Sequence, residues 1–231
     1  MQKEKQSSID ISFQQKADRL EITYFTDPLC CWSWGFEPHW RRLLNEFGDN
    51  ISYRYCMAGL LPSWKNYNDN ENSVSRPIQM GPVWMHAGHV SGVPIQTRLW
   101  MEDPPASSYP ACIAVKCATL QSPRAGEQYL QLTRNAVMVK GQNIAKTGVL
   151  DDIAKELTRL MPEFNTEQFR ADLRNDNGIE AFRKDMTEVQ LSGINRYPSL
   201  LIKNPGRNTI LITGYRPYEA LLEAMEQVLK E

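Results

Sequence analysis

Two adjacent thiols followed by an aromatic and a hydroxyl residue, Cys30-Cys31-Trp32-Ser33, form the part of this sequence best suited to chemistry. Cys30 follows a short apolar run and comes just before a segment in which apolar residues recur at helical spacing. A thiol at a helix N-terminus lies beside unpaired backbone N–H groups and the positive end of the helix dipole, which favour the thiolate. We therefore expect Cys30 to be an exposed, nucleophilic sulfur with a moderately lowered pKa, although Asp27 nearby opposes ionisation.

Ser33 occupies the position at which a dithiol redox site would carry its second cysteine. Serine has a similar shape but cannot form the disulfide that releases a bound substrate, so a single-thiol site depends on an external thiol such as glutathione. Cys31 is a poor substitute, because adjacent cysteines form a disulfide only in a strained ring with distorted peptide geometry. The expected chemistry is disulfide exchange or reduction at Cys30, with glutathione as a candidate co-substrate and no bound cofactor.

The elements that would position Cys30 follow from hydrophobic periodicity. Residues 20–26 alternate like a strand and stop at Asp27-Pro28, and apolar residues then recur at helical spacing as far as Gly48. Residues 51–60 have the pattern of a second strand. A strand, a helix and a strand within about 40 residues predict parallel pairing through a right-handed crossover.

The middle of the chain has a different character, and we expect residues 63–192 to be mostly helical. Residues 63–103 contain many Asn, Gly and Pro residues and are interpreted as loop. Ser107 or Ser108 can cap a helix that would run to about Gln121. Further helical patterns cover residues 124–139, 149–160, 165–174 and 178–191.

Strand patterns return near the end of the chain. Residues 199–203 and 209–213 flank a turn and predict an antiparallel hairpin, after which Pro217 leads into a final helix. The order predicts an α/β protein with one discontinuous domain. Residues 20–62 and 193–231 would form that domain, residues 63–192 would form a helical insertion, and residues 1–19 would be a polar N-terminal extension.

With Cys30 after the first strand and Pro198 before the third, this order resembles the thioredoxin-like fold of the DsbA-like family, which carries a large α-helical insertion. Two segments hold the resemblance, which extends over nearly all of residues 20–230. Asp27-Pro-Leu-Cys-Cys-Trp-Ser-Trp-Gly-Phe-Glu-Pro38 looks like the active-site segment of the FrnE type. Gly193-Ile-Asn-Arg-Tyr-Pro-Ser199 looks like the cis-proline loop of the family.

The resemblance implies roles for individual residues. Cys30 matches the nucleophilic cysteine, and Pro198 matches the cis-proline that packs beside the thiol. The backbone of Tyr197 would then pair with an extended substrate. Trp32 would line the mouth of the site. Glu37 is a candidate proton carrier near the thiol, and a solvated or capping carboxylate is the alternative.

The same segment is similar to kappa-class glutathione transferases and 2-hydroxychromene-2-carboxylate isomerases, whose motif reads Ser-Pro-Tyr-Ser-Trp-x-Gly-Phe-Glu or similar. Ser33, Trp34 and Glu37 fit that motif, and Cys30 stands where those enzymes hold a catalytic serine. This similarity implies a groove between the two domains that takes glutathione and a small electrophile.

In the same glutathione-using enzymes, a polar stretch at the start of the helical insert faces the active site. The corresponding residues here are Ser107, Ser108 and Tyr109. The similarity implies that they contact a small ligand. Simple helix capping is the alternative interpretation.

The composition limits the partners and the location. The formal net charge is -1, and 42% hydrophobic with 23% charged residues is ordinary for a globular protein, so nothing indicates binding to nucleic acid or to an anionic membrane. No apolar run approaches the roughly 20 residues of a transmembrane helix. The first eight residues lack the apolar core of a secretory signal, so we expect a cytoplasmic protein.

Nothing else in the sequence predicts a resident metal or a disulfide framework. The chain has five cysteines without regular spacing, and Cys56, Cys112 and Cys117 are interpreted as small buried side chains. His86 and His89 are three positions apart but have no obvious further ligands, so we expect no metal site there.

The leading hypothesis is a DsbA-like thiol–disulfide oxidoreductase with Cys30 as its single catalytic cysteine, assisted by Ser33 and Pro198. Its partners would be protein disulfides or small thiol substrates. One alternative is a glutathione-dependent transferase or isomerase of small electrophiles or aromatics. Another is a non-enzymatic adaptor that delivers partners to a protease, which the absence of a second cysteine would permit.

Overall fold

A computed structural model describes residues 19–65 and 67–230, so the predicted N-terminal extension lies almost entirely outside the described residues. The elements in chain order are β1 (Leu20–Thr26), α1 (Cys31–Phe47), η1 (Gly48–Asn50), β2 (Ile51–Met57), η2 (Pro77–Gln79), α2 (Met80–Ser91), α3 (Leu99–Glu102), α4 (Tyr109–Gln121), α5 (Pro123–Met138), α6 (Thr147–Leu160), α7 (Thr166–Arg174), α8 (Asn177–Leu191), β3 (Ser199–Lys203), β4 (Thr209–Thr213) and α9 (Tyr218–Lys230).

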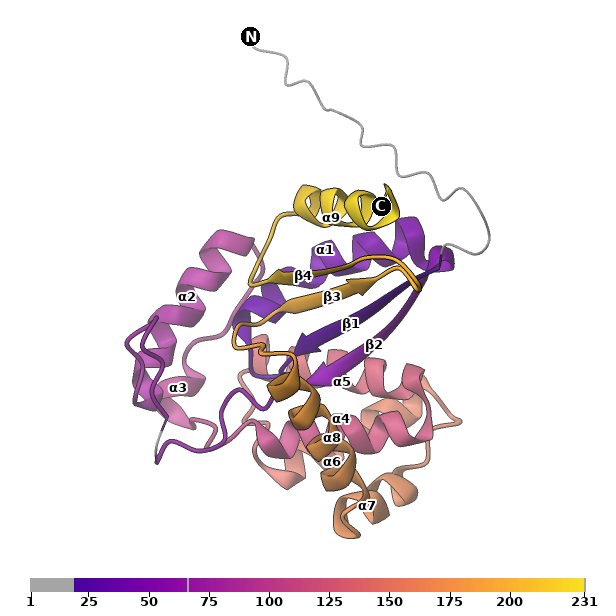
Figure 1. Ribbon diagram of the computed structural model, residues 1–231. Helices are drawn as coiled ribbons and strands as arrows, with labels where there is room; N and C mark the ends of the chain where they lie inside the picture. The colour runs from indigo at the N-terminus through magenta and orange to yellow at the C-terminus, as the bar shows by residue number, and fades with distance from the viewer. Residues whose placement is uncertain (1–18, 66, 231) are drawn as a thin grey trace.

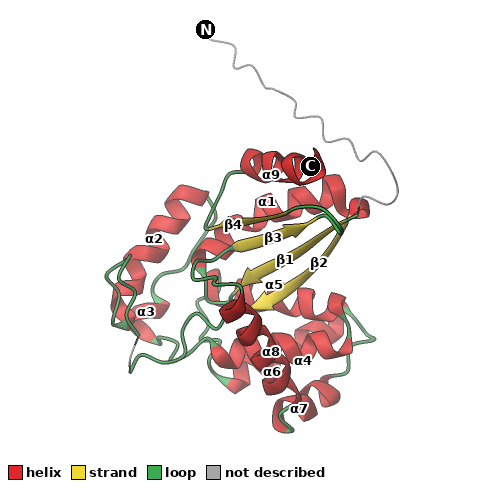
Figure 2. Ribbon diagram, viewed as in Figure 1, coloured by secondary structure: helices red, strands yellow, loops and turns green. Residues whose placement is uncertain are grey.

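The strands form one mixed sheet in the order β2-β1-β3-β4 (Figures 1 and 2). β1 and β2 pair in parallel, from Leu20 opposite Ile51 to Thr26 opposite Met57. β3 is antiparallel to both of its neighbours, β1 and β4. The predicted parallel crossover through α1 and the predicted hairpin of β3 and β4 are therefore confirmed.

Helices α1 and α9 cover the same face of the sheet (Figure 1). Alternate residues of β1 point to this face because side chains alternate along a strand, and Ile22 and Tyr24 are buried there. The Tyr24 ring meets Phe36 and Trp40 of α1 edge-on, with ring centroids 5.8 and 5.2 Å apart. This packing fixes α1, and with it the thiol at the start of α1.

The segment between β2 and β3 contains all of the helices from α2 to α8. In Figure 1, α4 to α8 gather as a block on one side of the sheet, while α2 and α3 form a separate arm beside the ends of the strands. A shared apolar core includes Trp84, Trp100, Tyr129 and Phe169. No helix in the described part of the chain has both the length and the apolar character needed to span a bilayer.

The interpretation of residues 63–103 as loop is wrong, because η2, α2 and α3 lie within them. Gly81, Pro82 and Gly88 give α2 a poor intrinsic helix propensity, which hides it in the sequence. Pro82 is tolerated because it lies in the first turn, where its missing N–H is not needed. Burial of Trp84, whose ring packs against Trp100 at 5.0 Å, supplies the tertiary stabilisation.

Candidate functional site

Cys30 lies at the N-terminal end of α1, directly after the turn that ends β1. Its Sγ accepts a hydrogen bond from the backbone N–H of Ser33 at 3.4 Å. The thiol donates to the carbonyl of Tyr197 at 3.7 Å, across 167 positions of sequence. The peptide bond between Tyr197 and Pro198 is cis. The fold thus brings together Cys30, Ser33, Tyr197 and Pro198, as the resemblance implied.

The Cys30 thiol is only 5% exposed, which contradicts the expectation of an exposed, acidified sulfur. Burial raises the pKa of Cys30 above its ordinary value of 9.0, and the negative charge of Asp27 raises it further. The hydroxyl and backbone N–H of Ser33 and the positive charge of Arg134 act in the opposite direction but are outweighed. The cost of removing the thiolate from water therefore exceeds the stabilisation that the helix N-terminus gives it, so the pKa stays raised and the thiol is protonated at neutral pH.

The protonated state of Cys30 predicts slow alkylation near neutral pH. In a Cys31→Ala background, we expect the rate of Cys30 labelling by iodoacetamide to rise about tenfold per pH unit from about pH 6 to beyond pH 9, because the rate follows the thiolate fraction. Mass spectrometry of the labelled peptide measures this rate, with free N-acetylcysteine as the reference and Cys30→Ser as the blank. A rate that levels off near pH 7 would contradict the raised pKa.

A cavity of about 690 Å³ opens beside Cys30. Its walls come from residues 29–32, Leu60, residues 67–72, helix α2, residues 195–197 and residues 213–216. Trp32 lies between two aromatic neighbours of this cavity, with ring centroids 5.6 Å from His86 and 5.7 Å from Tyr215. One wall of the cavity is therefore aromatic, and its three rings come from segments that are distant in the sequence. Sequence reasoning placed Trp32 here but missed Tyr215 and gave His86 no role.

The rim of the cavity is polar. Glu71 and Arg196 form an ion pair that connects the 67–72 loop to the cis-proline loop. Asp69 shapes the 67–72 loop by accepting hydrogen bonds from the backbone N–H groups of Glu71 and Asn72 at 3.0 and 3.1 Å. An aromatic wall beside polar side chains is typical of sites that take a peptide or a small amphipathic ligand.

Asp27 anchors the turn that carries Cys30. Its carboxylate is fully buried and accepts hydrogen bonds from the backbone N–H of Leu29 at 2.8 Å, the backbone N–H of Leu60 at 2.7 Å and the hydroxyl of Ser108 at 2.8 Å. The Cys112 thiol donates to the same carboxylate at 3.3 Å. Asp27 therefore ties the start of α1 to the end of β2 and to α4.

The implied ligand contacts of Ser107, Ser108 and Tyr109 require correction, because none of the three lines the cavity. Ser108 is fully buried on Asp27, and Ser107 donates to the carbonyl of Leu61 at 3.0 Å. The Tyr109 ring packs against Phe182 at 5.0 Å. These residues hold the insertion against the sheet, so the polar character of this stretch satisfies internal hydrogen bonds.

Glu37 also differs from its predicted role as a proton carrier. Its carboxylate accepts hydrogen bonds from Arg41 at 2.7 Å, Gln131 at 2.6 Å and Arg134 at 2.7 Å. Its partners are therefore two cations and an amide, and it makes no hydrogen bond to Cys30. Glu37 joins α1 to α5, and Arg134, which is fully buried beside it, was not identified from the sequence.

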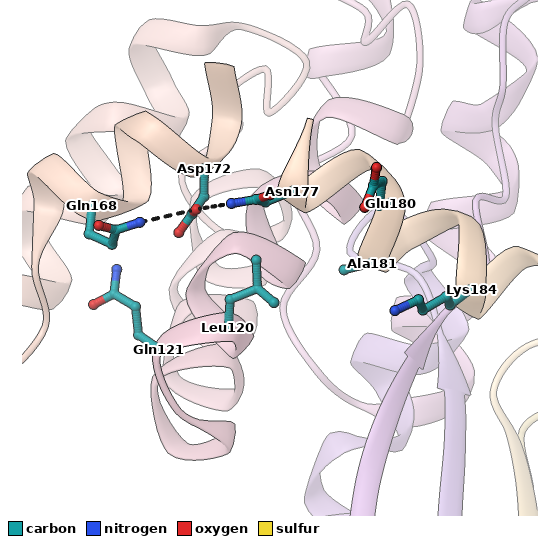
Figure 3. A pocket seen from close by; sticks show the side chains of 8 residues that line it. All are labelled: Leu120, Gln121, Gln168, Asp172, Asn177, Glu180, Ala181 and Lys184. Carbon is teal, nitrogen blue, oxygen red and sulfur yellow. Dashed lines mark hydrogen bonds between the residues drawn. The ribbon is translucent and has the colours of Figure 1, made fainter. Parts of the chain in front are cut away.

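A second cavity, of about 470 Å³, lies on the insertion between α4, α7 and α8. Figure 3 shows that the Gln168 and Asn177 amides point to the Asp172 carboxylate, at 3.1 and 2.8 Å. No thiol or histidine lines this cavity, and it contains none of the residues predicted to be functional. Within residues 19–65 and 67–230, no three His, Cys, Asp or Glu side chains cluster as a metal site would need.

The sheet order, the thiol at the start of α1 and the facing cis-proline define a protein of the thioredoxin-fold class with a helical insertion. A comparison with family models agrees, since the one described as "Thioredoxin" matches residues 24–223. The chain belongs to this thioredoxin family. The resemblance to its DsbA-like members and the predicted fold class are both confirmed.

Similar proteins carry different functional names. The ClpXP adapter protein SpxH of Halalkalibacterium halodurans is 29% identical over 225 residues, which cover 96% of this chain and 72% of that protein. A candidate protein disulfide isomerase from Nitrosomonas europaea superposes with a TM-score of 0.76 at 22% identity, covering 92% and 98% of the two chains.

Two further solved structures share the fold. The cytosolic disulfide reductase DsbM of Pseudomonas aeruginosa, solved with GSH, has a TM-score of 0.65 and 18% identity, with 91% and 97% coverage. A 2-hydroxychromene-2-carboxylate isomerase has a TM-score of 0.66 and 12% identity, with 91% and 96% coverage. A disulfide reductase and a 2-hydroxychromene-2-carboxylate isomerase are thus both structural neighbours of this chain.

Proposed function

We propose that this chain is a protein-binding adapter for a protease of the ClpXP kind, acting in the cytoplasm. The observation that carries the proposal is the similarity to ClpXP adapter SpxH, which extends over 96% of the chain and so includes the cavity and the insertion. An adapter needs surfaces that hold a partner but no turnover chemistry. The aromatic cavity with its polar rim provides such a surface.

The state of the thiol supports binding without catalysis. Ser33 stands where a second cysteine would release a mixed disulfide, and burial keeps the Cys30 thiol protonated at neutral pH. Cys31 is also buried, and burial raises its pKa well above the ordinary value. A site with a weak nucleophile and no resolving thiol is poorly equipped for disulfide exchange.

Protein turnover in the source cells tests the adapter proposal. We expect deletion of the gene to lengthen the half-lives of a small set of proteins several-fold, and deletion of ClpX to lengthen the half-lives of the same set. Pulse labelling with quantitative proteomics measures both. Because binding requires no thiolate, a Cys30→Ala chain should restore normal turnover, whereas Trp32→Ala should restore it poorly through loss of the cavity wall. Protein half-lives that are the same with and without the gene would refute the proposal.

A glutathione-linked, single-thiol oxidoreductase is the second candidate. It is favoured by the hydrogen bond from the Cys30 thiol to the Tyr197 carbonyl and by the cis-proline beside it. In that case the Cys30 thiolate would attack a glutathione adduct of a substrate, expel the substrate thiolate and form a mixed disulfide with glutathione. A second glutathione thiolate would then attack that disulfide, which restores the Cys30 thiol and releases oxidised glutathione. The same complementation experiment separates the candidates, because Cys30→Ala would then behave like the deletion.

A further inference from the structure

Strand β4 forms an edge of the sheet and pairs only with β3 among the described strands. At the turn between them, the backbone N–H of Asn204 donates to the carbonyl of Asn208 at 3.1 Å. Antiparallel strands alternate between hydrogen-bonded and non-hydrogen-bonded pairs. The backbone groups of Thr209, Leu211 and Thr213 therefore point away from β3. Their only hydrogen bond within the described chain is the one that Thr213 O accepts from the Arg216 side chain at 3.3 Å.

The sequence of β4, Thr-Ile-Leu-Ile-Thr, contains no charge and no proline, and its pairing with β3 has no bulge. Proteins commonly place a charged residue, a proline or a bulge on an edge strand to prevent edge-to-edge pairing, and β4 has none of the three. Leu211, at the centre of the strand, is 43% exposed. Such an edge is complementary to one kind of partner surface, which is another extended backbone.

Positive side chains surround this edge. Arg207 precedes β4, Arg216 follows it, and Lys203 lies on β3 opposite Thr209, all three exposed. Arg207 donates to the carbonyl of Leu229 at 3.4 Å and Arg216 to that of Thr213, so both cations bond to neutral groups. None of the three cations forms an ion pair within the described residues, although Glu21 of β1 is the cross-strand partner of Lys203.

The two flanking arginines disfavour a second copy of this chain as the partner. If two copies paired through β4 in antiparallel fashion, Arg207 of each copy would lie near Arg216 of the other. Like charges facing each other across strands are destabilising. The same charges attract a different chain that carries carboxylates at both ends of its strand.

We propose that β4 binds an extended segment of another protein by strand addition, and that this segment carries Asp or Glu on both sides of its strand-forming residues. Residues 213–216 also line the cavity beside Cys30, so the added strand would run to the rim of that cavity. The proposal uses no chemistry at Cys30. It therefore goes beyond the adapter function and does not depend on it.

Amide hydrogen exchange of the full chain, measured by NMR, tests the proposal with two synthetic peptides, EETVTVTEE and KKTVTVTKK. We expect the acidic peptide to slow exchange of the Thr209, Leu211 and Thr213 amides, with an affinity about tenfold above that of the basic peptide because of the charge pairing. Raising the salt concentration should reduce this difference. A version of the acidic peptide that is N-methylated at alternate residues cannot donate to the edge and should not bind.

Charge reversal provides the matched variants. Arg207→Glu with Arg216→Glu should exchange the preference, so that KKTVTVTKK binds better than EETVTVTEE. Arg124→Glu with Arg183→Glu makes the same net change on the insertion and should leave the preference unaltered. Equal binding of both peptides, protection at other amides only, or binding of the N-methylated peptide would overturn the proposal. A concentration-dependent dimer that protects the same amides would overturn it in favour of self-association.

Discussion

Replacing Arg134 with methionine is expected to lower the free energy of unfolding by about 3 kcal/mol, because it removes the fully buried one of the two cations that pair with the buried Glu37 carboxylate and leaves Arg41 as the other. The Arg134 side chain is fully buried on α5. Its Nη1 donates to Glu37 at 2.7 Å, and its Nη2 donates to the hydroxyl of Thr26. Methionine fills part of the volume but satisfies neither acceptor. Urea denaturation followed by circular dichroism measures the loss.

A double variant separates the charge effect from simple packing. In Glu37→Met with Arg134→Met, no uncompensated charge remains, because Arg41 keeps its ion pair with Glu127 at 2.6 Å. We therefore expect the double variant to be more stable than Arg134→Met alone. Arg98→Met is the control, since Arg98 forms an exposed pair with Glu102 and its loss should cost about 0–1 kcal/mol. An Arg134 variant as stable as this control would contradict the argument.

The importance of Arg134 could not be read from the sequence. Glu37 and Arg134 are 97 positions apart, and each lies on a helix where a charged residue is ordinarily solvated. Only the packing of α5 against α1 and the sheet converts them into a buried pair. The role of Glu37 was predicted wrongly for the same reason. Its position in the sequence, close to the thiol, suggested proton transfer. Its three hydrogen-bond partners in the structure show instead that it joins α1 to α5.

Local patterns were sufficient for most of the elements. The alternation of residues 20–26 and the apolar spacing of residues 150–160 gave β1 and α6 because burial on one face dictates those periods. Helix α2 was not predicted from its local pattern, because its glycines and proline lower the helix propensity of a segment that tertiary contacts stabilise. The pairing of Cys30 with Pro198 followed from a resemblance, whereas the burial of Cys30 arises from tertiary contacts, such as the one with the Tyr197 carbonyl, that local sequence patterns do not show.

Asparagine in place of Asp27 is expected to cost about 2–3 kcal/mol of stability, because one buried backbone donor must lose its acceptor. One carboxylate oxygen accepts from the Leu29 N–H, and the other accepts from the Leu60 N–H and the Ser108 hydroxyl. Whichever position the new amide nitrogen takes, it faces an N–H that also needs an acceptor. Asp103→Asn is the control, since the Asp103 side chain is about half-exposed and pairs with Lys146.

The same substitution should make Cys30 more acidic, since the negative charge of Asp27 helps to raise the pKa of that thiol. The alkylation profile of Cys30 would then shift to lower pH in Asp27→Asn while remaining unchanged in Asp103→Asn. Cys117, buried in α4, distinguishes a charge effect from general loosening of the fold. Faster labelling of Cys30 with unchanged labelling of Cys117 identifies Asp27 as a residue that keeps the thiol protonated. Parallel increases at both cysteines would instead assign Asp27 a purely structural role.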